Sequence, residues 1–222
     1  MKRNVKVSTA VIRRLPRYYR HLSELQEAGV VRISSSALGK SMGLTASQIR
    51  QDLFCFGEFG QQGYGYKVDS LKEEIGEILG ISRGHTLVVV GTGNLGRAII
   101  RNFKFSSNGF RLLAAFDVDP AVVGTEVAGV PVYHVDELER FAAKHPVSVG
   151  LLTVPIPAAQ AMGERLVKAG VRGIWNFTNC EISAPQEVVV ESVHFSDSLL
   201  ALSYMISRRD HLEESEGKEQ PV

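Results

Sequence analysis

One stretch of the chain, "LVVVGTGNLGRAII" at residues 87–100, constrains the fold more than any other. An apolar run typical of a strand leads into Gly91, Gly93 and Gly96, which have the spacing G-x-G-x-x-G, and a helix-like segment follows. In that order, the glycines let a pyrophosphate sit on backbone N–H groups at the positive end of a helix dipole. The stretch therefore predicts a strand, turn and helix that together bind a dinucleotide.

The chain after this stretch alternates apolar segments with amphipathic ones. Strands are expected at 86–90, 111–118, 149–154 and 171–177, with helices from Asn94, at 135–145 and at 157–169. This alternation predicts an α/β fold, a Rossmann-like doubly wound parallel sheet with right-handed crossovers.

Ligands of such sheets bind along the carboxyl ends of the strands. Asp117 ends the second strand, 21 residues after Gly96, where an acidic side chain accepts hydrogen bonds from the adenosine ribose and repels the 2′-phosphate of NADP(H). Asp119 is the competing candidate, and one of the two is expected to hold a turn before Pro120 instead. The ends of the next two strands bring Thr153, Val154, Pro155, Asn176, Phe177 and Thr178 toward the nicotinamide.

These strand ends lack the residues of an acid–base site. No histidine pairs with a carboxylate near them, and Cys180 has no clear activating cation, so it is expected to be a buried structural thiol. Cys55 and Cys180 are far apart and form no metal-binding spacing. The sequence therefore predicts no catalytic residue and no metal, and it leaves open a redox role for either cysteine.

The N-terminal part of the chain, before the glycine stretch, is strongly basic. Residues 1–50 contain ten lysines and arginines against two glutamates, whereas the whole chain has a net charge of only +1. Such an end is typical of a module that binds a polyanion, because each neutralised phosphate releases condensed counterions. A solvated helix face carries the same pattern, so charge alone leaves both interpretations open.

An amphipathic helix is expected over residues 8–28, broken or kinked at Pro16 and ended by Gly29. Arg14 and Arg17 lie on its basic face and are predicted to contact DNA. Its apolar positions, at spacings of three and four, are Ile12, Leu15, Tyr19, Leu22 and Leu25.

Two short helices follow and meet at the tight turn "MGLT". Gly43 ends the first, and Thr45 with Gln48 has the capping-box offset at the start of the second. A helix-turn-helix places its second helix in a major groove, with the N-terminal residues on base edges. The predicted DNA contacts here are Thr45, Ser47, Gln48, Arg50 and Gln51, whereas Ile49, Leu53 and Phe54 are expected in the core.

The next stretch, "FGEFGQQGYGYKV", alternates glycine with aromatic residues and predicts a short β-hairpin with a free tip. A hairpin after a recognition helix forms a wing, and Gly63 and Tyr64 are its predicted DNA contacts. Extended backbone would place Tyr64 and Tyr66 on the same face, and the aromatics can equally serve to pack the hairpin on the first helix.

These segments define four expected parts of the chain. They are a winged-helix DNA-binding domain at 1–83, which ends in a linker helix, a dinucleotide-binding domain at 84–195, a C-terminal helix at 196–211 and an acidic tail at 212–222. The C-terminal helix, with Leu199, Leu200, Leu202, Tyr204, Met205 and Ile206, is apolar over more than half its circumference and needs a partner surface. No secretion signal and no membrane-spanning run of about 18 apolar residues is visible, so a cytoplasmic protein is expected.

Taken in order, "RLPRYYRHL", "TASQIRQDL", "FGQQGYGY", "GTGNLGRA", "FDVDP", "LLTVP" and "NFTN" resemble the Rex family of bacterial redox-sensing transcriptional repressors across nearly the full length. The resemblance implies a homodimer that binds double-stranded operator DNA when NAD⁺ dominates and leaves it when NADH binds. It also implies that the C-terminal helix is exchanged between subunits. The cofactor site implied is Gly91, Thr92, Gly93, Asn94, Leu95, Gly96, Asp117 and Val118 at the adenosine and pyrophosphate side, with Thr153, Val154, Pro155, Asn176, Phe177 and Thr178 at the nicotinamide side.

One feature of the family is altered in this sequence. In some members an acidic residue near the start of the exchanged helix pairs with an arginine of the first helix. Arg20 is present here, but His194 stands where the acid is expected, with Asp197 nearby. The interdomain switch contact therefore stays open.

Two other functions compete with the repressor interpretation. The first is an NAD-dependent dehydrogenase or epimerase with a basic accessory domain, against which the missing acid–base residues argue. The second is a nucleotide-binding module similar to the small subunit of CoA ligases, which would leave the winged helix unexplained.

Overall fold

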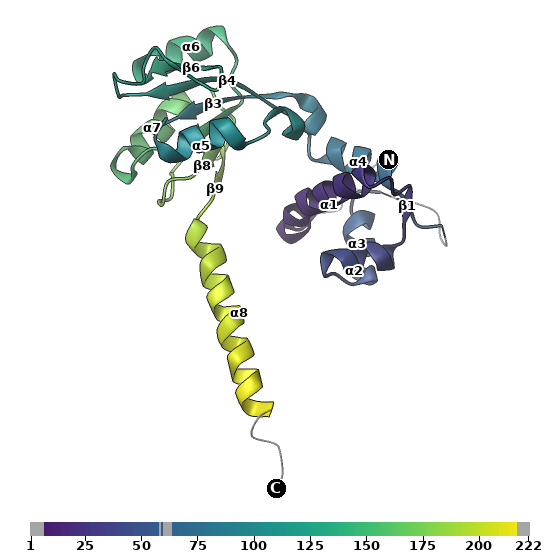
Figure 1. Ribbon diagram of the computed structural model, residues 1–222. Helices are drawn as coiled ribbons and strands as arrows, with labels where there is room; N and C mark the ends of the chain where they lie inside the picture. Colours follow the sequence, from purple (N-terminus) through teal and green to yellow (C-terminus); the bar gives the residue numbers. More distant parts are fainter. Residues whose placement is uncertain (1–6, 58, 60–63, 217–222) are drawn as a thin grey trace. The chain divides into compact units, whose positions relative to one another are not determined.

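The computed structural model describes residues 7–57, 59 and 64–216 (Figure 1). The chain divides into two compact units, Met1–Gly84 and His85–Val222. Each unit has a hydrophobic core of its own.

The first unit is a small helical domain with a two-stranded sheet. Its elements are α1 (Thr9–Glu27), β1 (Arg32–Ile33), α2 (Ser35–Met42), α3 (Ala46–Phe54), β2 (Tyr66–Lys67), α4 (Val68–Ile78) and the 3₁₀ turn η1 (Ile81–Arg83). Its core is a cluster of apolar side chains from the four α-helices and β2, including Leu15, Tyr18, Leu22, Leu38, Ile49, Leu53 and Ile75. The helix expected as a linker, α4, packs on α1 within this unit.

The first helix is continuous, and the expected break at Pro16 is wrong. Proline cannot donate to the carbonyl of residue 12, but Ile12 and Pro16 are both exposed, so water can satisfy that carbonyl. The buried residues of α1 are Val11, Leu15, Tyr18 and Leu22. Val11 and Tyr18 take the places predicted for Ile12 and Tyr19, one residue later in each case. Gly29, with φ +74°, ends the helix as expected.

The glycine-aromatic segment, where a hairpin is predicted, is described only in part. Its last strand, Tyr66–Lys67, pairs antiparallel with Arg32–Ile33 of β1. Gly65 has φ +69°, and this turn puts Tyr64 and Tyr66 on different sides: Tyr64 is 70% exposed and Tyr66 is 8% exposed. Residues 58 and 60–63, with the predicted contact Gly63, lie outside the described residues.

The second unit is built on a seven-stranded sheet with the order β5-β6-β4-β3-β7-β8-β9. All pairs are parallel except β5 with β6, which confirms the α/β fold with a doubly wound parallel sheet. The strands are β3 (His85–Val90), β4 (Phe110–Asp117), β5 (Glu126–Val127), β6 (Val130–His134), β7 (Val149–Leu152), β8 (Gly173–Asn176) and β9 (Val189–Ser192). The short strands β5, β6 and β9 were not expected.

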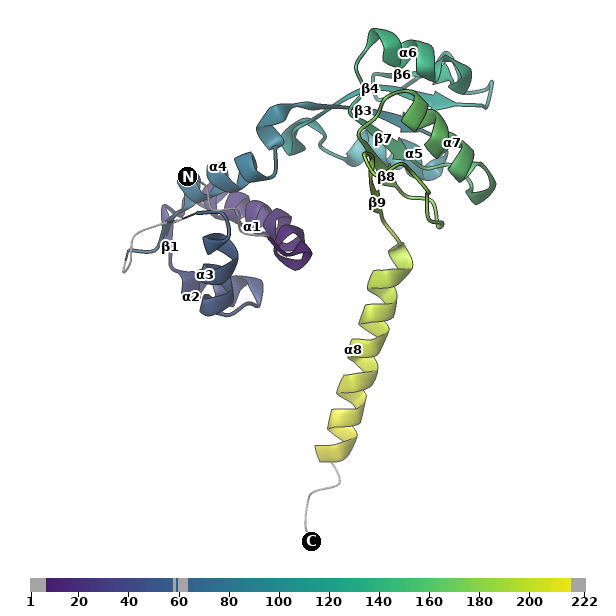
Figure 2. The same ribbon diagram turned by 180° about the vertical axis from the view of Figure 1, so that it is seen from behind.

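Helices cover both faces of this sheet (Figures 1 and 2). They are α5 (Asn94–Asn102), α6 (Leu138–Lys144) and α7 (Ile156–Lys168), with the short 3₁₀ turns η2 (Ser106–Asn108) and η3 (Val135–Glu137). The unit ends with α8 (Phe195–Glu216), which does not cover the sheet. Alternate residues of β3 point to opposite faces: Val88 and Val90 belong to the cluster with α6 and α7, and Leu87 and Val89 to the cluster with α5.

The last helix, α8, follows directly after β9. Its apolar side chains Leu199, Leu200, Leu202, Tyr204, Met205 and Ile206 are between 51% and 67% exposed. Such a row of exposed apolar residues marks an interaction surface. Across the described ranges, no helix is long and apolar enough to cross a membrane.

Candidate functional site

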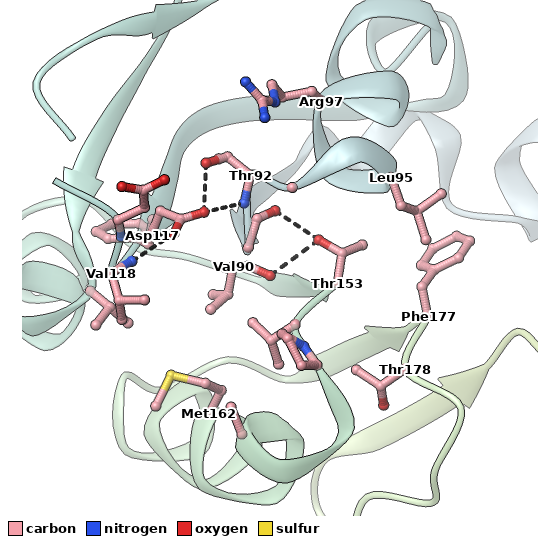
Figure 3. Close-up of a pocket in the computed structure, with 18 of the residues that line it drawn as sticks. Val90, Thr92, Leu95, Arg97, Asp117, Val118, Thr153, Met162, Phe177 and Thr178 are labelled. Atoms are coloured by element: carbon pink, nitrogen blue, oxygen red, sulfur yellow. Dashed lines mark hydrogen bonds between the residues drawn. The ribbon is translucent and has the colours of Figure 1, made fainter. Parts of the chain in front are cut away.

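A cavity of about 620 Å³ opens at the carboxyl ends of β3, β4 and β7 (Figure 3). The chain runs outward from β3 through β4 to β6 on one side and through β7 to β9 on the other, so the strand order reverses beside β3. Ligands of doubly wound sheets bind at such a reversal point. The cavity therefore lies where this fold holds a nucleotide.

The three fingerprint glycines lie at the turn from β3 into α5: Gly91 and Gly93 line the cavity, and Gly96 is in the first turn of α5. Gly91 has φ +98°, and a Cβ there would lie 2.8 Å from the Thr153 carbonyl oxygen. A Cβ on Gly96 would overlap the Gly91 carbonyl, so the close approach of α5 to the loop requires glycine. A Cβ on Gly93 would meet no atom within 4 Å. The space over Gly93 is thus open, at the helix N-terminus where a pyrophosphate would bind.

Asp117 fixes the loop from the adjacent strand. Its Oδ2 accepts hydrogen bonds from the Thr92 backbone N–H and, at 2.6 Å, from the Thr92 hydroxyl. Its Oδ1 accepts from the backbone N–H groups of Val118 at 2.8 Å and Asp119 at 3.0 Å. Burial alone would raise the pKa of the Asp117 carboxyl, but these four bonds hold it below its ordinary value. The carboxylate is therefore charged at neutral pH.

Asp119 has the turn role that one of the two aspartates was expected to have. Its Oδ1 accepts a hydrogen bond from the backbone N–H of Ala121 at 2.9 Å, across Pro120. Asp117 is thus the acid that borders the glycine loop, although both carboxylates line the cavity.

The opposite wall comes from the ends of β7 and β8. The Thr153 hydroxyl donates to the Gly91 carbonyl at 2.8 Å, which joins the β7 end to the glycine loop. Asn176 is completely buried: its amide nitrogen donates to the Cys180 carbonyl and the Ser192 hydroxyl, and its Oδ1 accepts from the Thr178 N–H and hydroxyl. Asn176 therefore shapes the turn that carries Phe177 and Thr178 to the cavity.

The structure brings most of the predicted cofactor residues together in the cavity wall. Lining residues among them are Gly91, Thr92, Gly93, Leu95, Asp117, Val118, Thr153, Val154, Pro155, Phe177 and Thr178, whereas Asn94, Gly96 and Asn176 stand behind the wall or outside it. The sequence prediction missed lining positions that include Arg97, Val122, Val135, Ile156, Met162 and Asn179. Arg97, Ile156 and Asn179 directly follow predicted residues. Val122, Val135 and Met162 lie outside the motifs, so only the folded sheet shows that these three line the cavity.

The wall carries few groups that could transfer protons. Its ionisable side chains are Asp117, Asp119 and Arg97, and apolar residues such as Val154 and Met162 make up much of the remainder. In the described ranges, no group of histidine, cysteine, aspartate and glutamate residues could hold a metal ion.

The first unit holds the predicted helix-turn-helix. The Thr45 hydroxyl caps α3 by accepting from the Gln48 N–H at 3.1 Å, as expected, and Gly43 ends α2 with φ +69°. Ser47, Arg50 and Gln51 are exposed on α3, and Gln48 is half-buried. Phe54 is 61% exposed, so the expectation that it lies in the core is wrong: it stands at the end of α3, away from the buried face of Ile49 and Leu53.

The two predicted arginine contacts of α1 have partners within the unit. Arg17 Nη2 donates to the Met42 carbonyl at 3.2 Å, at the C-terminus of α2. Arg14 forms a bidentate ion pair with the buried Asp52 of α3. Basic side chains thus connect the helices of this unit as well as giving it charge.

Near the start of α8, His194 Nε2 lies 3.4 Å from Glu181 Oε1, and the Asp197 N–H donates to the His194 carbonyl. The switch contact of Arg20 stays a prediction.

Comparison with known proteins agrees with this two-unit organisation. The family models "CoA binding domain" and "Putative DNA-binding protein N-terminus" match residues 82–180 and 6–53. The redox-sensing transcriptional repressor Rex of Clostridium beijerinckii is 44% identical over 210 residues, which are 95% of this chain and 100% of that protein.

Solved structures extend the similarity to the fold. The crystal structure of RSP, a Rex-family repressor, in complex with β-NAD⁺ and operator DNA has a TM-score of 0.86 and 44% identity, and covers 96% of this chain and 99% of that one. RSP in complex with β-NADH has a TM-score of 0.87 and 42% identity, and covers 94% of this chain and 98% of that one. These relatives are transcriptional repressors. The alternative function, an NAD-dependent dehydrogenase or epimerase, is therefore wrong for this chain. With 44% identity over nearly the full length of both sequences, the protein belongs to the Rex family of redox-sensing transcriptional repressors.

Proposed function

We propose that this repressor binds operator DNA as a homodimer and leaves it when NADH enters the cavity of the second unit. The observation that carries the proposal is that one chain contains two sites, a capped helix-turn-helix and a glycine-loop cavity. The wall of the cavity has ionisable groups only at its adenosine side. RSP was crystallised with β-NAD⁺ and operator DNA and also with β-NADH, which fits both sites.

The residues present fit a dinucleotide. The open space over Gly93 and the N-terminus of α5 suit the pyrophosphate, and the negative charge of Asp117 suits a ribose without a 2′-phosphate. Thr153, Val154, Pro155, Phe177 and Thr178 would form the nicotinamide side. This wall is largely apolar, and an apolar wall accepts the neutral ring of NADH more readily than the positively charged ring of NAD⁺.

The DNA site is proposed to consist of Thr45, Ser47, Gln48, Arg50 and Gln51 of the recognition helix α3, with Arg17 on α1 and Gly63 and Tyr64 beside the wing. Arg50 Nη1 donates to the Ser35 hydroxyl at 3.0 Å, so its guanidinium is already ordered on the exposed face of the motif. The exposed apolar side chains of α8 are proposed to pack against a second copy of the chain. Two recognition helices would then meet two half-sites on one face of the duplex.

The test is a fluorescence-anisotropy titration at fixed salt. The probes are the operator duplex to which RSP binds and a scrambled duplex of equal length, each titrated with the protein alone, with NADH and with NAD⁺. We expect binding to the operator, retention with NAD⁺ and release with NADH. Specific binding that neither cofactor form alters would refute the sensor function.

A further inference from the structure

The proposed function makes no use of the buried carboxylate of Asp52. This residue lies on the recognition helix α3, is 3% exposed and accepts hydrogen bonds on both oxygens. Arg14 donates to it from Nε at 2.7 Å and from Nη2 at 2.8 Å, and the Tyr18 hydroxyl donates at 2.8 Å. Both donors lie on α1, so the network joins two helices that are distant in sequence.

Apolar packing alone does not fix how α3 is rotated about its axis. Ile49 and Leu53 bury the inner face of α3, but hydrophobic contacts are non-directional. A bidentate bond between a guanidinium and a carboxylate has a defined plane and direction. Asp52 shares the buried face with Ile49 and Leu53, and Ser47, Arg50 and Gln51 lie on the exposed one.

The two donors of the network keep their protons at neutral pH. The hydrogen bond to Asp52 raises the pKa of Arg14, so this side chain stays cationic. Burial, together with the bond to Asp52, raises the pKa of Tyr18, so its hydroxyl stays a donor. Both donors to Asp52 therefore stay protonated at neutral pH.

We propose that Asp52 is a positioning residue which, with Arg14 and Tyr18, sets the rotation of the recognition helix on α1 and thereby its sequence specificity. Arg14 then acts through Asp52 and is not a phosphate contact, which revises its predicted role. The inference rests on the proposed function only in that α3 is the helix that reads DNA.

The two roles of Arg14 predict opposite effects of Asp52→Asn. If Arg14 contacts phosphate and Asp52 merely neutralises it, removing the acid frees the guanidinium and strengthens binding to any duplex. If Asp52 positions α3, the same variant weakens binding to the operator and leaves the scrambled duplex unaffected or bound slightly more tightly.

The experiment compares full-length wild type, Asp52→Asn and the milder Tyr18→Phe on both duplexes over a range of salt concentrations. For Asp52→Asn we expect an operator Kd at least about tenfold higher, which is the size of one lost specific base contact, with no change in the slope of log K against log salt. Tyr18→Phe should shift the operator Kd in the same direction by a smaller factor. Arg17→Ala is the control for a phosphate contact: both duplexes should weaken together, and the slope should fall by about 1.

Hydrogen exchange on the protein without DNA gives a second readout. Asp52→Asn should speed amide exchange in α3 while α4, which belongs to the same core, keeps wild-type rates, which also shows that the first unit of the variant is folded. Wild-type exchange in α3 together with unchanged operator preference would overturn the inference. A wild-type protein that never prefers the operator would instead refute the proposed function, and the exchange data would still decide whether Asp52 holds α3.

Discussion

At the scale of single residues, the three fingerprint glycines share a motif but have different physical requirements. Gly91 needs its positive φ, Gly96 needs the absence of a side chain against the Gly91 carbonyl, and Gly93 borders open space. The sequence predicted the motif from spacing alone. Which glycine serves the fold and which serves the ligand depends on distances that spacing does not contain.

Alanine substitutions should separate these requirements. Gly93→Ala, at a position with φ −63°, should leave the free energy of unfolding within about 0.5 kcal/mol of wild type. It should nevertheless weaken NADH binding at least tenfold, because the methyl group occupies the pyrophosphate space. Gly96→Ala should lower the free energy of unfolding by about 1–3 kcal/mol through overpacking. Urea denaturation and NADH fluorescence titration measure the two effects, and normal NADH affinity in folded Gly93→Ala would contradict this assignment.

Asp117 should decide between NADH and NADPH. Its charge repels a 2′-phosphate, so Asp117→Asn should narrow the ratio of the two affinities at least fivefold, an effect of about 1 kcal/mol. The matched control is Asp119→Asn, because Asp119 lines the same cavity but bonds to the turn at Ala121. An equal change in both variants would show that general negative charge, rather than Asp117 itself, sets the preference.

The same carboxylate should leave a signature in the pH dependence of stability. The folded pKa of Asp117 is lowered, so its contribution is present above the unfolded pKa and is lost as the pH falls through the folded one. Wild type should therefore exceed Asp117→Asn in urea midpoint at pH 7, and the difference should shrink below about pH 4. A difference that stays constant down to pH 3 would contradict the pKa shift.

At the scale of elements, the sequence predicted the long helices and the central strands but erred where tertiary contacts decide. The apolar stripe of α1 is displaced at two positions, and at one of them the buried Tyr18 donates its hydroxyl to Asp52, a contact that no local pattern shows. Strand β2 pairs with β1, some 30 residues earlier, and no local pattern reveals a pair of two-residue strands. Phe54 is exposed because it lies on the same face of α3 as the exposed Arg50 and Gln51.

The exposed apolar residues of α8 should form the dimer contact. Leu202→Glu combined with Ile206→Glu removes no packing within one chain, because both side chains are exposed there. The double variant should keep the helical content seen by circular dichroism but elute with the mass of one 24.3 kDa chain, where wild type should have twice that mass. A wild-type chain that is itself monomeric in light scattering would contradict the proposed dimer.

At the scale of the whole molecule, the two units were predictable from two separate signals, basic helices before a glycine loop and alternating strands after it. Their coupling was not, because an allosteric effect is a free-energy difference between two states of the dimer and no motif encodes it. His194 is an example, because it stands where some members of the family have an acid. Its neighbour within the unit is Glu181, 13 residues earlier in the sequence, and no motif predicted that contact.

Coupling between the sites has to be reciprocal. If NADH lowers operator affinity by some factor, saturating operator must lower NADH affinity by the same factor, about 5–150-fold for typical allosteric proteins. NADH fluorescence titrations with the operator duplex, with the scrambled duplex and without DNA measure this at one salt concentration. NAD⁺, measured by competition, should bind equally well in all three. Release of DNA by NADH without this reciprocal loss would mean that the release is not an equilibrium effect of NADH binding, for example because NADH aggregates the protein, which light scattering of the NADH complex would show.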